Sequence, residues 1–177
     1  MKFRNLTADE IEVRVAMVKE KGVGLLLYKD ARCDMNILDE TVGAENWERH
    51  HFDVKGSLFC ALRIRVPRYE TDPDGKQILA GYEWVEKCDC GTESNMEAKK
   101  GESSDSFKRA GFCWGIGREL YTAPFIWVDN KKCNITGTKC FDDFKVEKIV
   151  VEDGKITALS IWNNKMNCRA FAWKKGE

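Results

Sequence analysis

SSDSFKRAGFCWGIGRELY, residues 103–121, is the stretch whose pattern organises the expected fold. We expect a helix here with one side facing a core. The adjacent side chains of Lys108 and Arg109 point away from that inward side in different directions, and Phe112 and Ile116 lie on the opposite side with Lys108. A helix that is apolar on two sides predicts packing on both, against its own domain and against another subunit or a ligand. At helical spacing the inward side comprises Phe107, Ala110, Trp114, Gly117 and Tyr121, with Cys113 and Leu120 beside them.

The composition is typical of a globular protein. The 177 residues are 43% hydrophobic and 33% charged, which predicts a single domain over residues 1–177. No apolar run is long enough to cross a membrane, and the segment 1–22 lacks the apolar core of a signal peptide. We therefore expect no membrane partner and a cytoplasmic location.

Charge is balanced over the whole chain but separated along it. Basic and acidic side chains number 29 each, so the net charge indicates no polyanionic partner. Residues 71–95 carry two basic and six acidic side chains, whereas residues 131–177 carry ten basic and six acidic ones. This separation is compatible with a local basic groove. It is equally compatible with attraction between identical subunits, in which the acidic segment of one copy faces the basic segment of another.

Catalytic motifs find little support. His50 and His51 are adjacent, so at most one of them faces a given side of a strand, and the spacing of Cys88 and Cys90 differs from that of zinc ribbons. Gly115-Ile-Gly117 is only part of a dinucleotide-binding fingerprint, and no Walker lysine motif is present. We expect reduced cysteines, no nucleotide hydrolysis, no cofactor and no metal.

The flanking segments predict helices first and strands afterwards. Thr7-Ala-Asp-Glu10 fits a capping box that begins a helix ending at Gly22, and a second helix is expected between Asp30 and Gly43. Turn residues and alternation predict three antiparallel strands, a C-terminal hairpin around Asp153-Gly154 and a last strand. These strands are expected at 47–54, 57–66, 77–86, 146–152, 155–162 and 168–173, with short extended segments at 25–28 and 125–128.

The expected fold class is therefore α+β. A three-stranded antiparallel meander packs on the long helix in a β-β-β-α core, with N-terminal helices before it and a C-terminal β-hairpin after it. Arg63 and Arg65 alternate with apolar residues in the central strand, so both are expected on one face.

Basic and aromatic residues are interleaved along the chain. Proteins that bind single-stranded nucleic acid need cations that follow the phosphates and rings that stack on bases. Solvated charges on an ordinary surface are the alternative explanation. The interleaved positions are Tyr28-Lys29, Arg32, Arg63, Arg65, Arg68-Tyr69, Lys99-Lys100 and Lys108-Arg109.

Four segments of the chain carry a resemblance, namely Tyr28-Lys-Asp-Ala-Arg32, Asn36-Ile-Leu-Asp-Glu-Thr-Val-Gly43, Trp47, and Asp105-x-Phe-Lys108-Arg109-Ala110 with Trp114-Gly115. Together they resemble the N-terminal annealing domain of the Rad52 family, and within it the Sak-like single-strand annealing proteins of phages and prophages. The resemblance covers residues 10–121 as an annealing core and leaves residues 122–177 as a C-terminal extension.

This resemblance implies a homo-oligomeric ring or helical arc that holds single-stranded DNA in a basic groove. Complementary strands would anneal there without ATP, in phage or prophage recombination and repair in the cytoplasm of a bacterial host. It also implies two companions, a single-strand binding protein and a phage exonuclease. No chemical step on the DNA is involved, so the protein would not be an enzyme.

The groove residues follow from the same resemblance. Lys108 and Arg109 match its paired basic residues, Tyr28 matches an aromatic position near the strand, and Arg14 is a looser match to a groove arginine. Where relatives often carry a further basic residue, this chain has Phe112 and Cys113. The expected DNA-binding set is completed by Arg63, Arg65, Lys99 and Lys100.

Two other function classes stay open from the sequence. One is a cytosolic thiol- or zinc-dependent nucleic-acid enzyme that uses Cys88 and Cys90 with His50 or His51. The other is a structural protein whose basic residues pair with the acidic loop of a neighbouring copy. The second class predicts oligomers that have no affinity for DNA.

Overall fold

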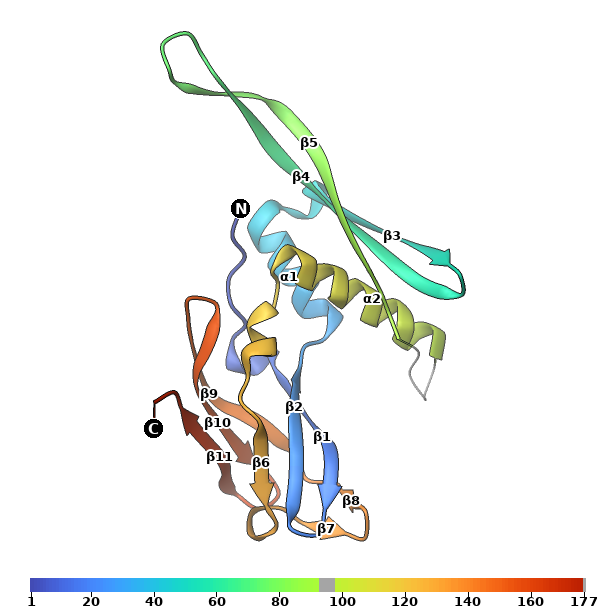
Figure 1. Ribbon diagram of the computed structural model, residues 1–177, viewed down its shortest axis with the longest axis vertical. Coiled ribbons are helices and arrows are strands. Elements are labelled where there is room, and N and C mark those ends of the chain that lie inside the picture. Colours follow the sequence, from blue (N-terminus) through green and yellow to red (C-terminus); the bar gives the residue numbers. More distant parts are fainter. Residues whose placement is uncertain (93–97, 177) are drawn as a thin grey trace. The chain divides into compact units, whose positions relative to one another are not determined.

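The computed structural model describes residues 1–92 and 98–176, and for residues 98–100 the backbone alone (Figure 1). Two compact units make up the chain. The first unit contains Met1–Phe3 and Ala31–Ile116, and the second contains Arg4–Asp30 and Gly117–Glu177. Each unit therefore combines segments that are distant in the sequence.

The first unit consists of a three-stranded antiparallel sheet and two α-helices. Helix α1 (Ala31–Val42) and the 3-10 turn η2 (Ala44–Asn46) precede the sheet, and helix α2 (Ala98–Trp114) follows it. The predicted strands are confirmed, although the second and third extend further than expected. They are β3 (Trp47–Val54), β4 (Ser57–Thr71) and β5 (Gln77–Cys90), in the order β3-β4-β5.

One face of this sheet packs against α2. Alternation along β4 puts Leu62 and Ile64 on that face, and both are fully buried. Phe107 of α2 is equally buried and stacks on Trp47 of β3, with ring centroids 6.1 Å apart. The indole Nε1 of Trp114 donates to the Leu62 carbonyl at 3.0 Å. The predicted inward side of the helix is therefore confirmed at Phe107 and Trp114.

Helix α2 ends seven residues earlier than the segment 103–121 predicted. Gly115 and Gly117 have φ values of 102° and 71°, a left-handed backbone that favours glycine. The amide of Ile116 donates to the Gly111 carbonyl at 3.0 Å, and that of Gly115 donates to the Phe112 carbonyl at 3.0 Å, which closes the helix. The helix prediction is therefore wrong beyond Trp114, and Tyr121 lies in the following 3-10 turn η3 (Arg118–Thr122).

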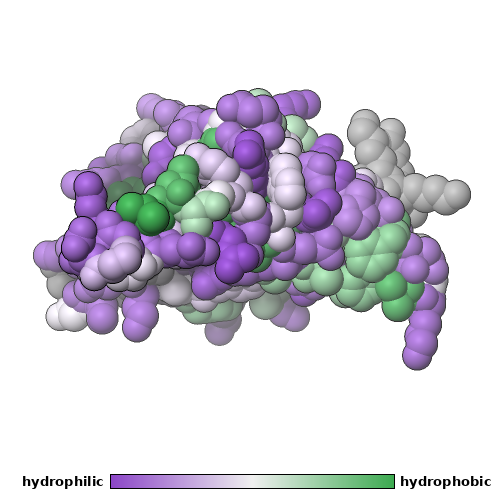
Figure 2. All heavy atoms as spheres, turned by 90° about the horizontal axis from the view of Figure 1, so that it is seen from above, coloured by the Kyte–Doolittle hydropathy of each residue, from purple (hydrophilic) through white to green (hydrophobic). Residues whose placement is uncertain are grey.

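Strands β4 and β5 are longer than β3 and continue past its first residue. The first residue of β3, Trp47, pairs with Ile64, so residues 65–84 form a two-stranded extension that we call the arm (Figure 1). Its turn is held by Asp72, whose Oδ1 accepts from the amides of Asp74 and Lys76 at 3.0 and 2.8 Å. In Figure 2, where the arm points toward the viewer, hydrophobic side chains in green reach the surface between hydrophilic ones.

The second unit contains a six-stranded antiparallel sheet in the order β11-β10-β9-β1-β2-β6. The predicted hairpin is confirmed as β9 and β10, with Asp153 and Gly154 in its turn at φ 49° and 71°. A two-stranded pair, β7 (Ile135–Thr136) and β8 (Lys139–Cys140), follows the turn η4 (Asn130–Lys132). The large sheet comprises β1 (Glu12–Lys19), β2 (Gly22–Tyr28), β6 (Ile126–Asp129), β9 (Phe144–Glu152), β10 (Lys155–Asn163) and β11 (Cys168–Lys174).

This sheet overturns the expected fold class of α+β with a C-terminal hairpin. The protein is mostly β, with 51% of residues in strands and 24% in helices, and the described residues contain two α-helices. The predicted first helix is instead the 3-10 turn η1 (Ala8–Glu10) followed by β1. Val13 and Val15 alternate with charged residues, and β-branched side chains favour a strand once the hairpin partner β2 is available. The C-terminal hairpin joins that same sheet.

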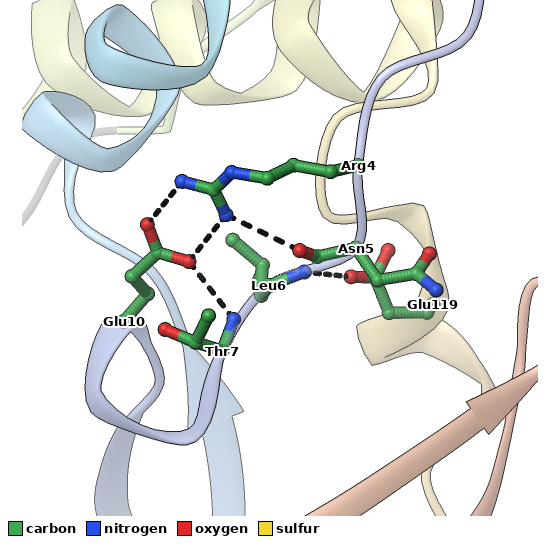
Figure 3. A network of polar contacts seen from close by, with 6 residues as sticks. All are labelled: Arg4, Asn5, Leu6, Thr7, Glu10 and Glu119. Carbon is green, nitrogen blue, oxygen red and sulfur yellow. Dashed lines mark hydrogen bonds and ion pairs between the residues drawn. The ribbon is translucent and has the colours of Figure 1, made fainter. Parts of the chain in front are cut away.

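The predicted capping box is present, and it ties down the segment before β1 (Figure 3). The carboxylate of Glu10 accepts from the Arg4 guanidinium at 2.7 and 2.8 Å and from the Thr7 amide at 2.8 Å. Hydrogen bonding to Arg4 is the main cause that lowers the pKa of Glu10 from 4.5 to about 2. The Leu6 amide donates to the buried carboxylate of Glu119 at 2.7 Å, which attaches the same segment to η3.

A membrane-spanning helix would need a long apolar stretch. Among the described residues, neither α-helix is both long and apolar enough to cross a bilayer.

Candidate nucleic-acid interface

The predicted basic pair lies on α2, one residue beyond the buried Phe107. Because Lys108 and Arg109 are adjacent, their side chains leave the helix in different directions, and both are half-buried. Within the described part of the chain, Lys108 forms no ion pair with a carboxylate. Its ammonium group is therefore available to an anion from outside.

Arg109 has a partner on the sheet. Its guanidinium lies 3.2 Å from the carboxylate of Asp89 on β5, and the two side chains are 39% and 29% exposed. The Asp89 carboxylate also accepts from the amide of Cys90 at 2.8 Å, which fixes its position. This ion pair links α2 to β5 and partly neutralises Arg109, whereas Lys108 keeps its full charge.

Two cations that the sequence interpretation missed flank the same helix. The Arg49 guanidinium lies 4.3 Å from the ring centroid of Phe107, and the Lys87 ammonium lies 4.6 Å from that of Trp114. Lys87 also donates to the Cys113 carbonyl at 3.0 Å, at the negative end of the helix dipole. Strand alternation could have identified both, since Arg49 and Lys87 pair in register with the inward-facing Leu62.

Arg63 and Arg65 share one face of β4, as predicted, but it is the face opposite α2. Arg63 pairs with Glu48 at 2.5 Å and with Glu86 at 3.7 Å, so its charge is balanced by two carboxylates. Arg65 lies over the ring of Tyr82, 4.3 Å from its centroid. Within the first unit these two arginines therefore do not converge with Lys108.

Arg14 and Tyr28 belong to the second unit and come together there. They lie on the adjacent strands β1 and β2, and the Arg14 guanidinium stacks 4.9 Å from the Tyr28 ring centroid. Arg14 also pairs with Glu12, whose register partner is Tyr28. All three side chains are exposed on one face of the sheet. A cation over an aromatic face is an arrangement that can receive a nucleotide.

Two of the predicted positions cannot be compared in this way. Lys99 and Lys100 lie in the first turn of α2, but their side chains fall outside the described residues. Their role stays a prediction.

The residues of the enzyme hypothesis do not assemble into a metal centre in the described part of the chain, where no group of three or more His, Cys, Asp or Glu side chains could hold an ion. His51 Nε2 lies 3.1 Å from both the Oγ and the carbonyl of Ser103, a contact that holds α2 to the sheet. Cys60 was not among these residues. Its burial raises the pKa of its thiol to about 11, which keeps that thiol protonated and unreactive at neutral pH.

Comparison with known families gives a match over residues 4–139 to the model of the Rad52/22 family double-strand break repair protein. The chain belongs to the Rad52/22 family. The matched region contains segments of both units, including the stacked pair Arg14 and Tyr28 and the basic pair on α2. Strands β9, β10 and β11 follow the matched region. No curated protein and no solved structure gave a significant match.

Membership in a family of double-strand break repair proteins supports a role in DNA repair and recombination for this chain. It agrees with the resemblance that the motifs between Tyr28 and Trp114 indicated. The cations and rings that could contact DNA are then those around α2 and those on the face of β1 and β2.

Proposed function

We propose that this Rad52/22 family member binds single-stranded DNA and anneals complementary strands without ATP. The observation that carries the proposal is Lys108, a lysine on α2 within the matched region whose charge is not balanced by a carboxylate among the described residues. Arg49, Lys87 and Arg109 lie around the same helix and add positive potential to it.

A chain with no net charge can bind a polyanion only through a local surface. Binding would therefore depend on the few cations that face the strand, and it should weaken steeply with salt as counterions return to the phosphates. The sequence information would come from base pairing, since phosphate contacts position a strand without reading it. No bond in the DNA is made or broken, so the protein would act as a binding protein and not as an enzyme.

We also propose that the protein works as a homo-oligomer, a ring or helical arc. The arm supports this part of the proposal, because an isolated two-stranded ribbon is marginally stable in water. Its large side chains are exposed at 59% for Tyr69, 46% for Ile78, 50% for Leu79, 53% for Tyr82 and 40% for Trp84. A neighbouring copy that covers them would remove apolar surface from water.

The finer assignment is to the Sak-like members of phages and prophages. It rests on the motifs around Tyr28, Asn36 and Lys108. It implies that the protein works in the cytoplasm of a bacterial host, with a single-strand binding protein and a phage exonuclease as companions. Of these companions, the exonuclease would supply the resected strands that the protein anneals.

The test is a fluorescence-anisotropy titration of a labelled oligothymidylate at several salt concentrations. Lys108→Ala should weaken binding and reduce the slope of log affinity against log salt by about 0.7 for each protomer that contacts the strand. Lys155→Ala, at the turn of the β9–β10 hairpin after the matched region, removes the same charge and should leave the slope unchanged. Equal affinity and slope for Lys108→Ala and the wild type would reject α2 as the phosphate-binding element.

A further inference from the structure

One face of the second unit's sheet exposes a group of large apolar side chains. Phe125 is 73% exposed, Leu26 49%, Met17 40% and Tyr28 36%. Together with Trp127 they form what we call the aromatic face. On the opposite face of the same strands, Val23, Leu25, Ile126 and Val128 are almost completely buried. The exposure of the aromatic face is therefore a property of that face and not of the strands in general.

The strand register makes this face continuous. Met17 of β1, Gly24 of β2 and Trp127 of β6 are direct cross-strand partners, so they form one row. The two glycines of β2 make room for the large side chains beside them. A Cβ at Gly22 would lie 2.2 Å from the Val128 carbonyl oxygen and 2.9 Å from the Trp127 indole, and a Cβ at Gly24 would lie 3.4 Å from the Cβ of Met17. The indole of Trp127 and the thioether of Met17 thus cover the glycine backbone.

The rings of this face are arranged as flat surfaces. Phe125 and Trp127 stack with centroids 6.3 Å apart and planes inclined by 16°. At the end of β2, Tyr28 holds the guanidinium of Arg14 over its ring. Flat rings at the surface are what unstacked nucleobases require, and such stacking is tolerant of base identity.

Positive charge lies at both ends of β1, on the same side of the sheet as these rings. Lys19 is the cross-strand partner of Gly22, and Lys145 of β9 is the partner of Glu12, so both lie on the same side of the sheet as the aromatic face. Across the described residues neither lysine forms an ion pair. Two of the acidic side chains nearby pair with arginines, Glu12 with Arg14 and Glu147, which also attracts Lys145, with Arg169 at 2.6 Å. Asp129 accepts from the Lys131 amide at 2.9 Å. Rings flanked by available lysines match the bases and phosphates of one strand.

From this arrangement we propose that the aromatic face binds the bases of single-stranded DNA, with Phe125 and Trp127 as stacking surfaces and Lys19 and Lys145 as phosphate contacts. The inference rests on the proposed function, and it extends that function to β6, which neither the motifs nor the basic pair on α2 indicated. A second copy of the chain is the competing occupant, and the experiment distinguishes it.

The experiment compares two probes of equal length, an oligothymidylate and an abasic deoxyribose-phosphate strand, at one salt concentration. Phe125→Ala should bind the oligothymidylate about tenfold more weakly while its affinity for the abasic strand stays at the wild-type value. Phe125→Trp should restore binding, and Phe125→Leu should not, because it keeps apolar area but loses the ring. Phe141→Ala is the matched control, since Phe141 is 67% exposed on the same unit outside the aromatic face.

Each outcome has a separate meaning. If the wild type binds neither probe, the proposed function itself fails. If the wild type binds both probes and Phe125→Ala loses no affinity for either, the aromatic face does not stack on bases and this inference is overturned. If Phe125→Ala instead lowers the molar mass in light scattering with DNA affinity intact, the face is an interface between copies, which also overturns it.

Discussion

Arg109 and Lys108 are adjacent on α2, yet the structure gives them different surroundings, and this difference can be measured. Arg109 pairs with Asp89, whereas Lys108 has no carboxylate partner in the described chain. If the ion pair holds Arg109 against β5, a phosphate must compete with Asp89 for the guanidinium. Removing the carboxylate by Asp89→Asn should therefore strengthen DNA binding and weaken the fold.

The magnitude follows from the geometry of the pair. The atoms are 3.2 Å apart and the side chains are about a third exposed, so solvent screening limits the pair to about 1 kcal/mol. Asp89→Asn should lower the free energy of unfolding by that amount. If binding no longer has to break the pair, affinity for single-stranded DNA should rise by about fivefold. Arg109→Ala should destabilise slightly more, because the stem of the arginine is lost as well.

The assay is a double-mutant cycle of Asp89→Asn and Arg109→Ala, measured by urea unfolding and by anisotropy with an oligothymidylate. The unfolding cycle should give a coupling energy of about 1 kcal/mol, and the affinity gained with Asp89→Asn should vanish in the double variant. A coupling near zero, or weaker DNA binding by Asp89→Asn, would refute this assignment of Arg109.

Three further predictions concern the N-terminal segment, a buried thiol and the arm. Because the folded-state pKa of Glu10 is about 2, below its ordinary 4.5, its stabilisation is present above pH 4.5 and is lost as the pH falls toward 2. Glu10→Gln should therefore lower the free energy of unfolding by about 1 kcal/mol at pH 7, and denaturant titrations should show this difference shrinking as the pH falls from 4.5 through 2. The pKa of about 11 for Cys60 predicts that iodoacetamide at pH 8 labels the exposed Cys88 and leaves Cys60 unmodified until urea is added, as peptide mapping would show; rapid labelling of Cys60 in the native protein would contradict it. Leu79→Glu places a charge on the arm and should lower the molar mass in light scattering with an unchanged thermal midpoint, whereas Lys76→Ala at the arm's turn should not; an unchanged mass for Leu79→Glu would show that the arm is not the interface.

The parts of the fold that were predictable are those with local signals. The Asp153-Gly154 turn and the alternation in β4 specify hairpins from neighbouring residues alone. Phe107 and Trp114 recur at helical spacing, and both face the sheet as expected. These features need no knowledge of what the rest of the chain does.

The misassigned segment shows where local signals are ambiguous. Ile11, Val15 and Val18 fit a helical repeat, and the capping box before them is real, but Val13 and Val15 fit a strand equally well. The decision comes from β2 and β9, which flank β1 in the sheet, and β9 lies more than a hundred residues away. Such pairing cannot be read from the segment itself, and it changed the fold class.

The candidate site divides in the same way. The basic pair on α2 and the pair Arg14 and Tyr28 carry motif signals, so the sequence could indicate them. Arg49 and Lys87 could have been found from strand alternation once the register was known. The neutralisation of Arg63 by Glu48 and Glu86 depends on cross-strand partners, and the aromatic face depends on β6 joining β2. Only the three-dimensional pairing reveals these.

The central claim is that the protein anneals complementary strands through cations on α2 without ATP. The most direct measurement is annealing of two complementary oligonucleotides, labelled as a fluorescence donor and acceptor, with purified protein and no nucleotide. The account predicts that the wild type and Lys155→Ala accelerate annealing well above the spontaneous rate, whereas Lys108→Ala loses most of the acceleration. Annealing by the wild type at the spontaneous rate, or equal acceleration by Lys108→Ala, would contradict it.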